Sequence, residues 1–282
     1  MNDETRELDI DRVRELAKLR AVLSVPGIQD VEVRSDIPCQ THGGANLSLD
    51  VYLPSGSSRA SPAVIFVAGY GDQGLSHLVG LRLKEWGCYV SWGQLVAASG
   101  LVGITYSCSD PLADATEVLS FVRQNAADLG VDPARIGIWA TSGNGPTALS
   151  LLTNGPSGLR FAVLSNAYLL DLDGDSTVAD QAARFGFAAP NSGKAVGDVD
   201  PDVPLFLVRS GRDEVPGLNQ TMDRFIERAI AANLPVRLVN LPDAPHSFDT
   251  LHDTEQSRDA IREIVAFMRV SSDLQGAPVN ET

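Results

Sequence analysis

The chain has 282 residues, of which 44% are hydrophobic, and this fits one large α/β domain or two small ones. The formal net charge of −14 argues against a nucleic-acid-binding protein and against docking on an anionic membrane surface. No apolar run reaches the ~20 residues of a membrane span, and the start of the chain lacks the features of a secretory signal. Cys39, Cys88 and Cys108 lack the spacing of metal ligands. We therefore expect a cytoplasmic protein with reduced thiols and no metal.

The first predicted element is an amphipathic helix in the N-terminal segment 1–27. Apolar residues recur at helical spacing through residues 4–24, with charged residues between them. They are Leu8, Val13, Leu16, Leu19, Val22 and Leu23. We expect this helix to lie on the main body or on another subunit, which would give a homodimer. Residues 31–37 and 47–53 then alternate apolar and polar side chains, as half-exposed strands do.

The rest of the chain alternates buried strands with helices. Continuous apolar runs predict strands at 63–68, 101–106, 136–140, 161–165, 204–208 and 236–241. Helices are predicted at 91–99, 112–129, 143–153, 217–232 and 254–270. This alternation predicts an α/β fold with a mostly parallel central sheet and helices on both faces, forming a single domain over 1–282. Residues 167–200 interrupt the pattern, and we interpret them as a lid-like insertion with a short helix at 178–186.

Ser142 is the candidate nucleophile, because it lies between a buried strand and a helix in a run of small residues. A sharp turn at that junction would lift the hydroxyl clear of the sheet. The alternative role for Ser142 is an ordinary N-cap of the following helix, since serine is a preferred N-cap residue.

A serine hydroxyl needs a base and an acid to become a nucleophile. Asp213 and Glu214 both follow a buried strand on a turn, which is where reactive groups gather in doubly wound sheets. His246 lies just after the last strand, and an imidazole there can accept a proton near neutral pH and return it later. His252 falls at the start of the final helix and is the weaker candidate.

Acyl transfer also needs hydrogen-bond donors for the oxyanion. One expected donor is the backbone N–H of Gly143, directly after the nucleophile. The second should come from the loop after the first buried strand, and we assign it to the N–H of Tyr70. The simpler alternative is that this loop is only a glycine turn.

Two other motifs are interpreted as structural. Trp86, Tyr89 and Trp92 gather around the start of a helix, where core packing is a better interpretation than a pocket wall. Residues 171–175 are similar to the opening of a calcium loop, but the glycine comes too early and Ala182 occupies the position of the closing glutamate.

Together these residues resemble the α/β-hydrolase superfamily, in particular its dienelactone hydrolase-like and small serine carboxylesterase branch. The similarity covers about residues 45–270 and is carried by segments 64–71, 92–100, 131–139, 141–145, 211–213 and 245–249. The chain order Ser142, Asp213, His246 is the superfamily's order of nucleophile, acid and base, and its Gly-Arg-Asp turn favours Asp213 over Glu214.

The resemblance implies an α/β-hydrolase fold and a serine hydrolase that cleaves small-molecule carboxylic esters through an acyl-enzyme, without a cofactor. True dienelactone hydrolases use cysteine as the nucleophile, so Ser142 implies ordinary ester hydrolysis. Ala140 and Asn144 stand where the usual turn has glycine. The alternatives are a lactone or dienelactone-type hydrolase, a peptidase of the prolyl oligopeptidase type, which usually carries a further propeller domain, and a hydrolase fold that binds a ligand without catalysis.

Overall fold

The computed structural model describes residues 10–40, 46–56 and 59–273. Its centre is an eight-stranded sheet with the order β1-β2-β4-β3-β5-β6-β7-β8. The strands are β1 Glu32–Gln40, β2 Asn46–Leu53, β3 Ser61–Phe66, β4 Val102–Tyr106, β5 Val131–Ser142, β6 Ala162–Ala167, β7 Leu205–Arg212 and β8 Val236–Pro245. The pairs β1/β2 and β2/β4 are antiparallel and the other pairs are parallel, which confirms the predicted mostly parallel sheet.

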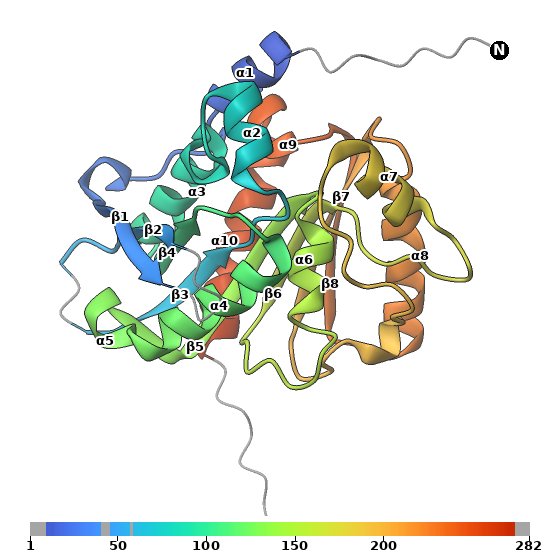
Figure 1. The fold of residues 1–282 in the computed structure, drawn as a ribbon. Coiled ribbons are helices and arrows are strands. Elements are labelled where there is room, and N and C mark those ends of the chain that lie inside the picture. Colours follow the sequence, from blue (N-terminus) through green and yellow to red (C-terminus); the bar gives the residue numbers. More distant parts are fainter. Residues whose placement is uncertain (1–9, 41–45, 57–58, 274–282) are drawn as a thin grey trace, which may run out of the picture.

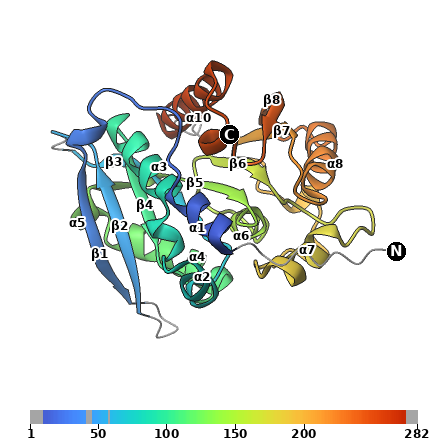
Figure 2. The same ribbon diagram turned by 90° about the horizontal axis from the view of Figure 1, so that it is seen from above.

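Helices cover both faces of this sheet (Figures 1 and 2). The longer ones are α1 Ile10–Lys18, α2 Asp72–Val79, α3 Gly87–Ala98, α4 Pro111–Gln124, α7 Thr177–Phe185, α8 Leu218–Ala231 and α10 Glu255–Asp273. The short ones are α5 Ala126–Leu129, α6 Gly145–Ser150, α9 Phe248–Leu251, η1 Ile28–Asp30, η2 Leu83–Glu85 and η3 Val196–Asp198. Helices α3 and α10 lie against one face, and α4, α6 and α8 lie against the other. Within the described residues, none of these helices combines the length and the apolar character that crossing a bilayer requires.

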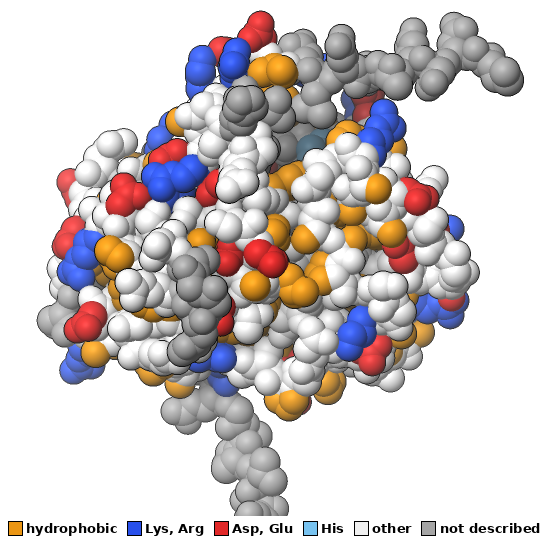
Figure 3. All heavy atoms as spheres, in the orientation of Figure 1, with side chains coloured by type: hydrophobic (Ala, Val, Ile, Leu, Met, Phe, Trp, Pro, Cys, Tyr) orange, Lys and Arg blue, Asp and Glu red, His pale blue; other side chains and the backbone are white. Residues whose placement is uncertain are grey.

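The central strands form the core, because helices shield both of their faces from water. Figure 3 shows the outer surface of one side, where apolar side chains gather around α6 and charged side chains lie mainly toward the periphery. Inside the molecule, Tyr89 and Trp92 from α3 are buried and pack against Trp139 of β5. Their role is therefore core packing, as the sequence indicated.

Two helix predictions need correction in the central part of the chain. The predicted helix at 112–129 is two helices, because the first ends at Gln124 and Asn125 separates it from α5. Helix α2 was not predicted, because it is short and contains Gly74, although Leu75, Leu78 and Val79 have helical spacing. Helix α6 ends at Ser150, earlier than the predicted end at residue 153.

The predicted N-terminal helix is too long. Residues 4–9 lie outside the described residues, α1 ends at Lys18, and residues 19–24 are not helical. We call residues 19–24 the N-terminal strap. Its backbone bonds to the main body, because Ala21 N–H donates to Ser91 Oγ at 2.8 Å and Val22 N–H donates to the Asp249 carbonyl at 2.7 Å. Its Leu23 side chain is buried in the core, so the apolar pattern reflects tertiary burial, not a continuing helix.

The segment 167–200 leaves the carboxyl end of β6 and contains α7, close to the predicted 178–186 helix. Phe187, just after α7, forms an isolated antiparallel bridge with Tyr70, and Ala188 N–H donates to the Gly69 carbonyl at 2.9 Å. The insertion is thereby attached to the loop after β3.

Candidate active site

Ser142 ends β5 with a φ of 54°, a left-handed conformation that is unusual for serine. The chain reverses there and enters α6 three residues later, and the N-cap of α6 is Asn144. The alternative role of Ser142 as an N-cap is therefore wrong. Small neighbours make the turn possible, since a Cβ on Gly143 would overlap the Tyr70 hydroxyl and one on Gly145 would overlap the Tyr168 carbonyl. The turn has the form that presents a hydroxyl at the edge of a sheet.

The structure brings Ser142, His246 and Asp213 together into one hydrogen-bonded chain. His246 Nε2 lies 3.1 Å from Ser142 Oγ, and His246 Nδ1 lies 2.7 Å from Asp213 Oδ2. Because an ionised carboxylate only accepts hydrogen bonds, Nδ1 carries the proton in this arrangement and Nε2 accepts from the serine hydroxyl. The three residues come from the carboxyl ends of three parallel strands, β5, β7 and β8.

The acid is held from both sides. Asp213 Oδ1 accepts the Val215 N–H at 2.9 Å, while Oδ2 faces His246. The Asp213 side chain is 0% exposed and that of His246 is 24% exposed, so the hydrogen-bonded chain runs from the interior toward solvent. Ser247, which follows the histidine, has a φ of 55° and turns the chain sharply into α9.

The competing residues lie elsewhere. Glu214 is exposed and is not part of the hydrogen-bonded chain of Asp213, His246 and Ser142. His252 Nδ1 lies 3.0 Å from Ser257 Oγ at the start of α10, so its contacts belong to a helix terminus. The geometry therefore brings Asp213 and His246 to Ser142, and not Glu214 or His252.

The expected oxyanion donors lie on two loops that touch. The first two N–H groups of the loop after β3 bond to side chains. Ala68 N–H donates to Tyr106 Oη at 3.0 Å, and Gly69 N–H donates to Asn144 Oδ1 at 2.6 Å. Among the described residues, neither the Tyr70 N–H nor the Gly143 N–H has an acceptor. Two backbone donors beside the nucleophile are thus left for another group.

Aromatic side chains stand next to these donors. Phe187 packs edge-on against Tyr70, with ring centroids 5.9 Å apart, and stacks on Tyr168 at 5.2 Å. The Tyr168 hydroxyl donates to the Pro216 carbonyl at 2.6 Å. Burial raises the pKa of Tyr70 to about 12, so its phenol stays protonated in the physiological range. We call Tyr70, Tyr168 and Phe187 the aromatic wall.

One buried carboxylate near the base was not anticipated. Asp249, three residues after His246, accepts a hydrogen bond from Trp92 Nε1 at 2.7 Å. Burial raises the pKa of the Asp249 carboxyl, and the Trp92 hydrogen bond partly opposes this effect. The only sequence signal was its place in the Pro-His-Ser-Phe-Asp segment.

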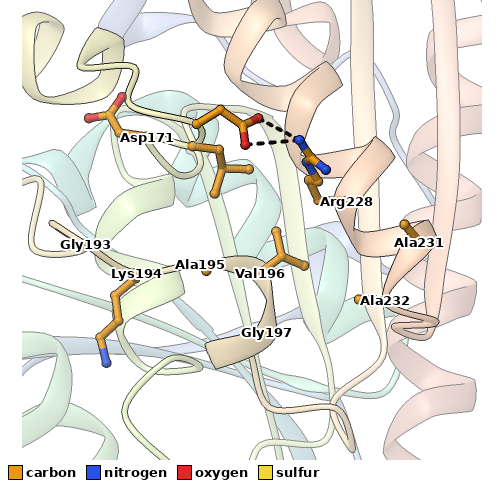
Figure 4. A pocket seen from close by; sticks show the side chains of 11 residues that line it. Asp171, Gly193, Lys194, Ala195, Val196, Gly197, Arg228, Ala231 and Ala232 are labelled. Atoms are coloured by element: carbon orange, nitrogen blue, oxygen red, sulfur yellow. Dashed lines mark hydrogen bonds and ion pairs between the residues drawn. The ribbon is translucent and has the colours of Figure 1, made fainter.

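A separate hollow of about 630 Å³ lies between the insertion and the end of α8 (Figure 4). Arg228 pairs with Asp173 at 3.1 Å at this hollow, whereas the Lys194 amine points away from Arg228 and donates to the Thr153 carbonyl. Ser142 and His246 do not line it, so we do not place the reaction there.

The carboxylates in the segment that is similar to a calcium loop accept hydrogen bonds from backbone N–H groups and do not form a coordination site. Asp171 accepts the N–H groups of Val178 and Ala179, and Asp175 accepts that of Thr177. In the part of the chain that the structure describes, no group of three or more histidine, cysteine or acidic residues could hold a metal ion.

The comparisons with known proteins identify the fold. No family model matches the chain, and no curated protein matches it. Among solved structures, an esterase from Thermogutta terrifontis is 20% identical with a TM-score of 0.61, covering 95% of this chain and 100% of that chain. Brefeldin A esterase, a bacterial homologue of human hormone sensitive lipase, is 16% identical with a TM-score of 0.70, covering 94% and 84%.

Dipeptidyl peptidase 4 from Porphyromonas gingivalis shares the same fold over part of its length. It is 18% identical with a TM-score of 0.61, covering 84% of this chain but 36% of that chain. The chain therefore has the α/β-hydrolase fold, as the sequence predicted.

Proposed function

We propose that this protein is a serine hydrolase that cleaves carboxylic esters through an acyl-enzyme intermediate. The observation that carries the proposal is the hydrogen-bonded chain from Asp213 through His246 to Ser142, with the serine held at a left-handed turn. This arrangement of groups generates an activated serine on several unrelated folds. The esterases among the structural neighbours support the same choice.

In the first half of the proposed reaction, Ser142 Oγ attacks the ester carbonyl carbon while His246 Nε2 takes the hydroxyl proton. Asp213 holds the imidazole and stabilises its positive charge. The N–H groups of Tyr70 and Gly143 donate to the oxyanion. The carbon–oxygen bond to the alcohol then breaks, and His246 returns its proton to the leaving oxygen.

The second half repeats these roles with water. His246 takes a proton from a water molecule, whose oxygen attacks the acyl carbon on Ser142. The tetrahedral intermediate collapses, Ser142 Oγ leaves with the proton from His246, and the carboxylic acid is released. No cofactor takes part in either half.

Within the superfamily we assign the protein to the dienelactone hydrolase-like and small serine carboxylesterase branch. The motifs at 64–71, 141–145 and 211–213 support this assignment, and Ser142 in place of cysteine favours ordinary esters over dienelactones. A lactone hydrolase is the second candidate, because the same relay opens a cyclic ester.

The test is hydrolysis of p-nitrophenyl acetate and butyrate by wild type, Ser142→Ala and Ser150→Ala. We expect Ser142→Ala to lose activity by several orders of magnitude, because no other hydroxyl takes its place in the relay. Ser150 is the matched control, since it is buried in α6 and its hydroxyl donates to the Thr147 carbonyl. A fluorophosphonate probe should label Ser142 alone. Equal activity in wild type and Ser142→Ala would remove Ser142 from the mechanism, whereas no activity in either protein would favour a hydrolase fold that binds a ligand without catalysis.

We also propose that the protein is cytoplasmic and that it forms a homodimer. The three cysteines are free, and burial raises the pKa of Cys39 to about 11 and that of Cys88 to about 12, which suits unreactive thiols in a reducing compartment. Cell fractionation tests the location. Light scattering of the chain with and without residues 1–25 tests whether the N-terminal segment holds a dimer together.

A further inference from the structure

The two proposed oxyanion donors belong to loops far apart in sequence, and one side chain connects those loops. Asn144 follows Gly143, and its Oδ1 accepts the N–H of Gly69, which precedes Tyr70, at 2.6 Å. Each donor peptide is therefore next in sequence to a residue of this hydrogen bond. A shift at Asn144 would change the separation of the two donors directly.

The Asn144 amide is also fixed on its other side. Its Nδ2 donates to the Thr141 carbonyl at 2.8 Å and to Tyr89 Oη at 2.9 Å. Tyr89 is itself held in the core against Trp139, with ring centroids 5.9 Å apart. Asn144 is only 3% exposed, so these bonds are shielded from water.

The chemistry of the position requires an amide. One acceptor must face the Gly69 N–H while two donors face a carbonyl and a phenol. Aspartate would place a second acceptor against the Thr141 carbonyl, and glycine would leave the Gly69 N–H and the Thr141 contact without a side-chain partner. This explains in physical terms why asparagine can stand where glycine is usual.

The two loops are too close to tolerate a change in their spacing. A Cβ on Gly69 would lie 2.5 Å from the Gly143 carbonyl oxygen and 2.6 Å from Asn144 Cα. The backbones are already in van der Waals contact, and the Asn144 side chain fixes how they lie against each other. Oxyanion donors stabilise the transition state because their positions are fixed in advance. A contact that sets those positions therefore affects the reaction rate.

We propose that Asn144 is a positioning residue that holds the Tyr70 and Gly143 N–H groups at the spacing that the oxyanion requires. Asn144 does not touch the substrate and acts only through those donors. The inference rests on the serine hydrolase function proposed above and deepens it.

The decisive variant is Asn144→Gly, because glycine is compatible with the turn but cannot make the bridging hydrogen bonds. With p-nitrophenyl butyrate, kcat should fall about 10- to 100-fold, while KM stays within about threefold of wild type. Asn191→Ala is the matched control. Asn191 is also a buried asparagine, but its bonds do not join the two donor loops: its Nδ2 donates to the Pro146 carbonyl at 2.6 Å and its Oδ1 accepts from the Thr153 hydroxyl. It should lower the melting temperature but keep wild-type kcat.

A second measurement separates positioning from a general loss of structure. A trifluoromethyl ketone forms an oxyanion adduct with the serine, whereas the corresponding alcohol does not. Asn144→Gly should weaken binding of the ketone by about the same factor by which it lowers kcat/KM. It should leave binding of the alcohol unchanged. Equal weakening of both ligands would indicate a structural role and overturn the proposal.

The remaining outcomes are also informative. Tyr89→Phe removes one partner of the Asn144 amide and should lower kcat in the same direction by a smaller factor, and this variant carries the test if Asn144→Gly does not fold. Full activity of Asn144→Gly, with Ser142→Ala inactive, would overturn the positioning role alone. Full activity of Ser142→Ala would instead overturn the proposed function.

Discussion

At the scale of single residues, the relay depends on which acid faces His246. The sequence placed Asp213 and Glu214 side by side on one turn, and only a resemblance favoured the first. The structure buries the Asp213 carboxylate against the imidazole and leaves Glu214 exposed. This difference arises from the direction in which each side chain leaves the turn, which residue type does not encode.

Asp213→Asn should therefore lower kcat on p-nitrophenyl esters by about 10³- to 10⁴-fold, because an amide no longer fixes the correct tautomer of His246. Glu214→Gln is the adjacent control and should keep wild-type kcat. Steady-state kinetics of both variants make the comparison. A large loss in Glu214→Gln together with an active Asp213→Asn would reverse the assignment.

Asn144 shows the limit of sequence reasoning at this scale. Its identity was noticed as a departure from glycine, but its partners Gly69 and Tyr89 are distant in the chain. No local pattern signals such a contact. Ser142 and His246 stand out in the sequence because each lies at the end of a recognisable strand, whereas the choice of Asp213 over Glu214 depended on the resemblance.

At the scale of elements, the predicted strands are present, and the errors are the limits of several helices and the missed helix α2. Helix α4 begins at an N-cap, since the Asp110 side chain accepts the Ala113 N–H and Pro111 is the first helical residue. The N-terminal strap was assigned to a helix because its apolar residues have helical spacing. Its actual partners, Ser91 and Asp249, become neighbours only in the folded molecule.

The junction of β5 and α6 should be sensitive to any added methyl group. In Gly145→Ala, the new Cβ would overlap the backbone carbonyl of Tyr168, which cannot move aside as a side chain would. We expect a loss of about 1–3 kcal/mol in the free energy of unfolding and a lower kcat. Gly74→Ala in α2 is the control, since its Cβ meets nothing within 4 Å. It should be neutral or raise stability by about 0.5–1 kcal/mol in urea denaturation.

The insertion should affect which acyl groups are accepted, because it supplies two members of the aromatic wall. Phe187→Ala opens space beside Gly143 and should raise the ratio of kcat/KM for p-nitrophenyl hexanoate to that for the acetate by about 10-fold, within the range for hydrophobic pocket changes. Phe185→Ala, at the end of the preceding helix α7, is the comparison: Phe185 is only partly buried against the same cluster, and its removal should change the ratio less. An unchanged ratio in Phe187→Ala would remove the wall from acyl selection.

At the scale of the whole molecule, charge is mostly a surface property. Acidic residues outnumber basic ones, 36 to 22, and many ion pairs are exposed, so they contribute little to stability. Lys84 differs, because its side chain is 1% exposed and its amine lies 2.6 Å from Asp50 and 3.0 Å from Asp36. It connects η2 to the edge strand β1 and to the neighbouring strand β2.

Lys84→Met should lower the free energy of unfolding by about 3–5 kcal/mol at neutral pH, because Asp50 is left as a buried charge without its counterion. Lys18→Met removes an exposed pair, with exposed fractions of 65% and 73%, and should cost less than about 0.5 kcal/mol. Urea denaturation at matched pH gives both values. Similar losses in the two variants would contradict the structural role of Lys84.

The overall architecture was predictable because its cause is simple. Alternating apolar runs and helices have few stable arrangements, and a parallel sheet covered on both faces is the one that buries them all. The satellite cluster around Phe187 and the hollow beside Arg228 were not predictable, since both depend on how an irregular insertion lies against distant elements.

The order of the strands in the sheet has a consequence for how the proposed active site forms. Ser142 ends a central strand, whereas His246 follows β8, which lies at the edge of the sheet and is synthesised late. Contacts of such long sequence separation close slowly during folding. Refolding chains should thus regain their far-ultraviolet circular dichroism before they regain esterase activity. A chain with nearly all of its secondary structure formed would still be inactive.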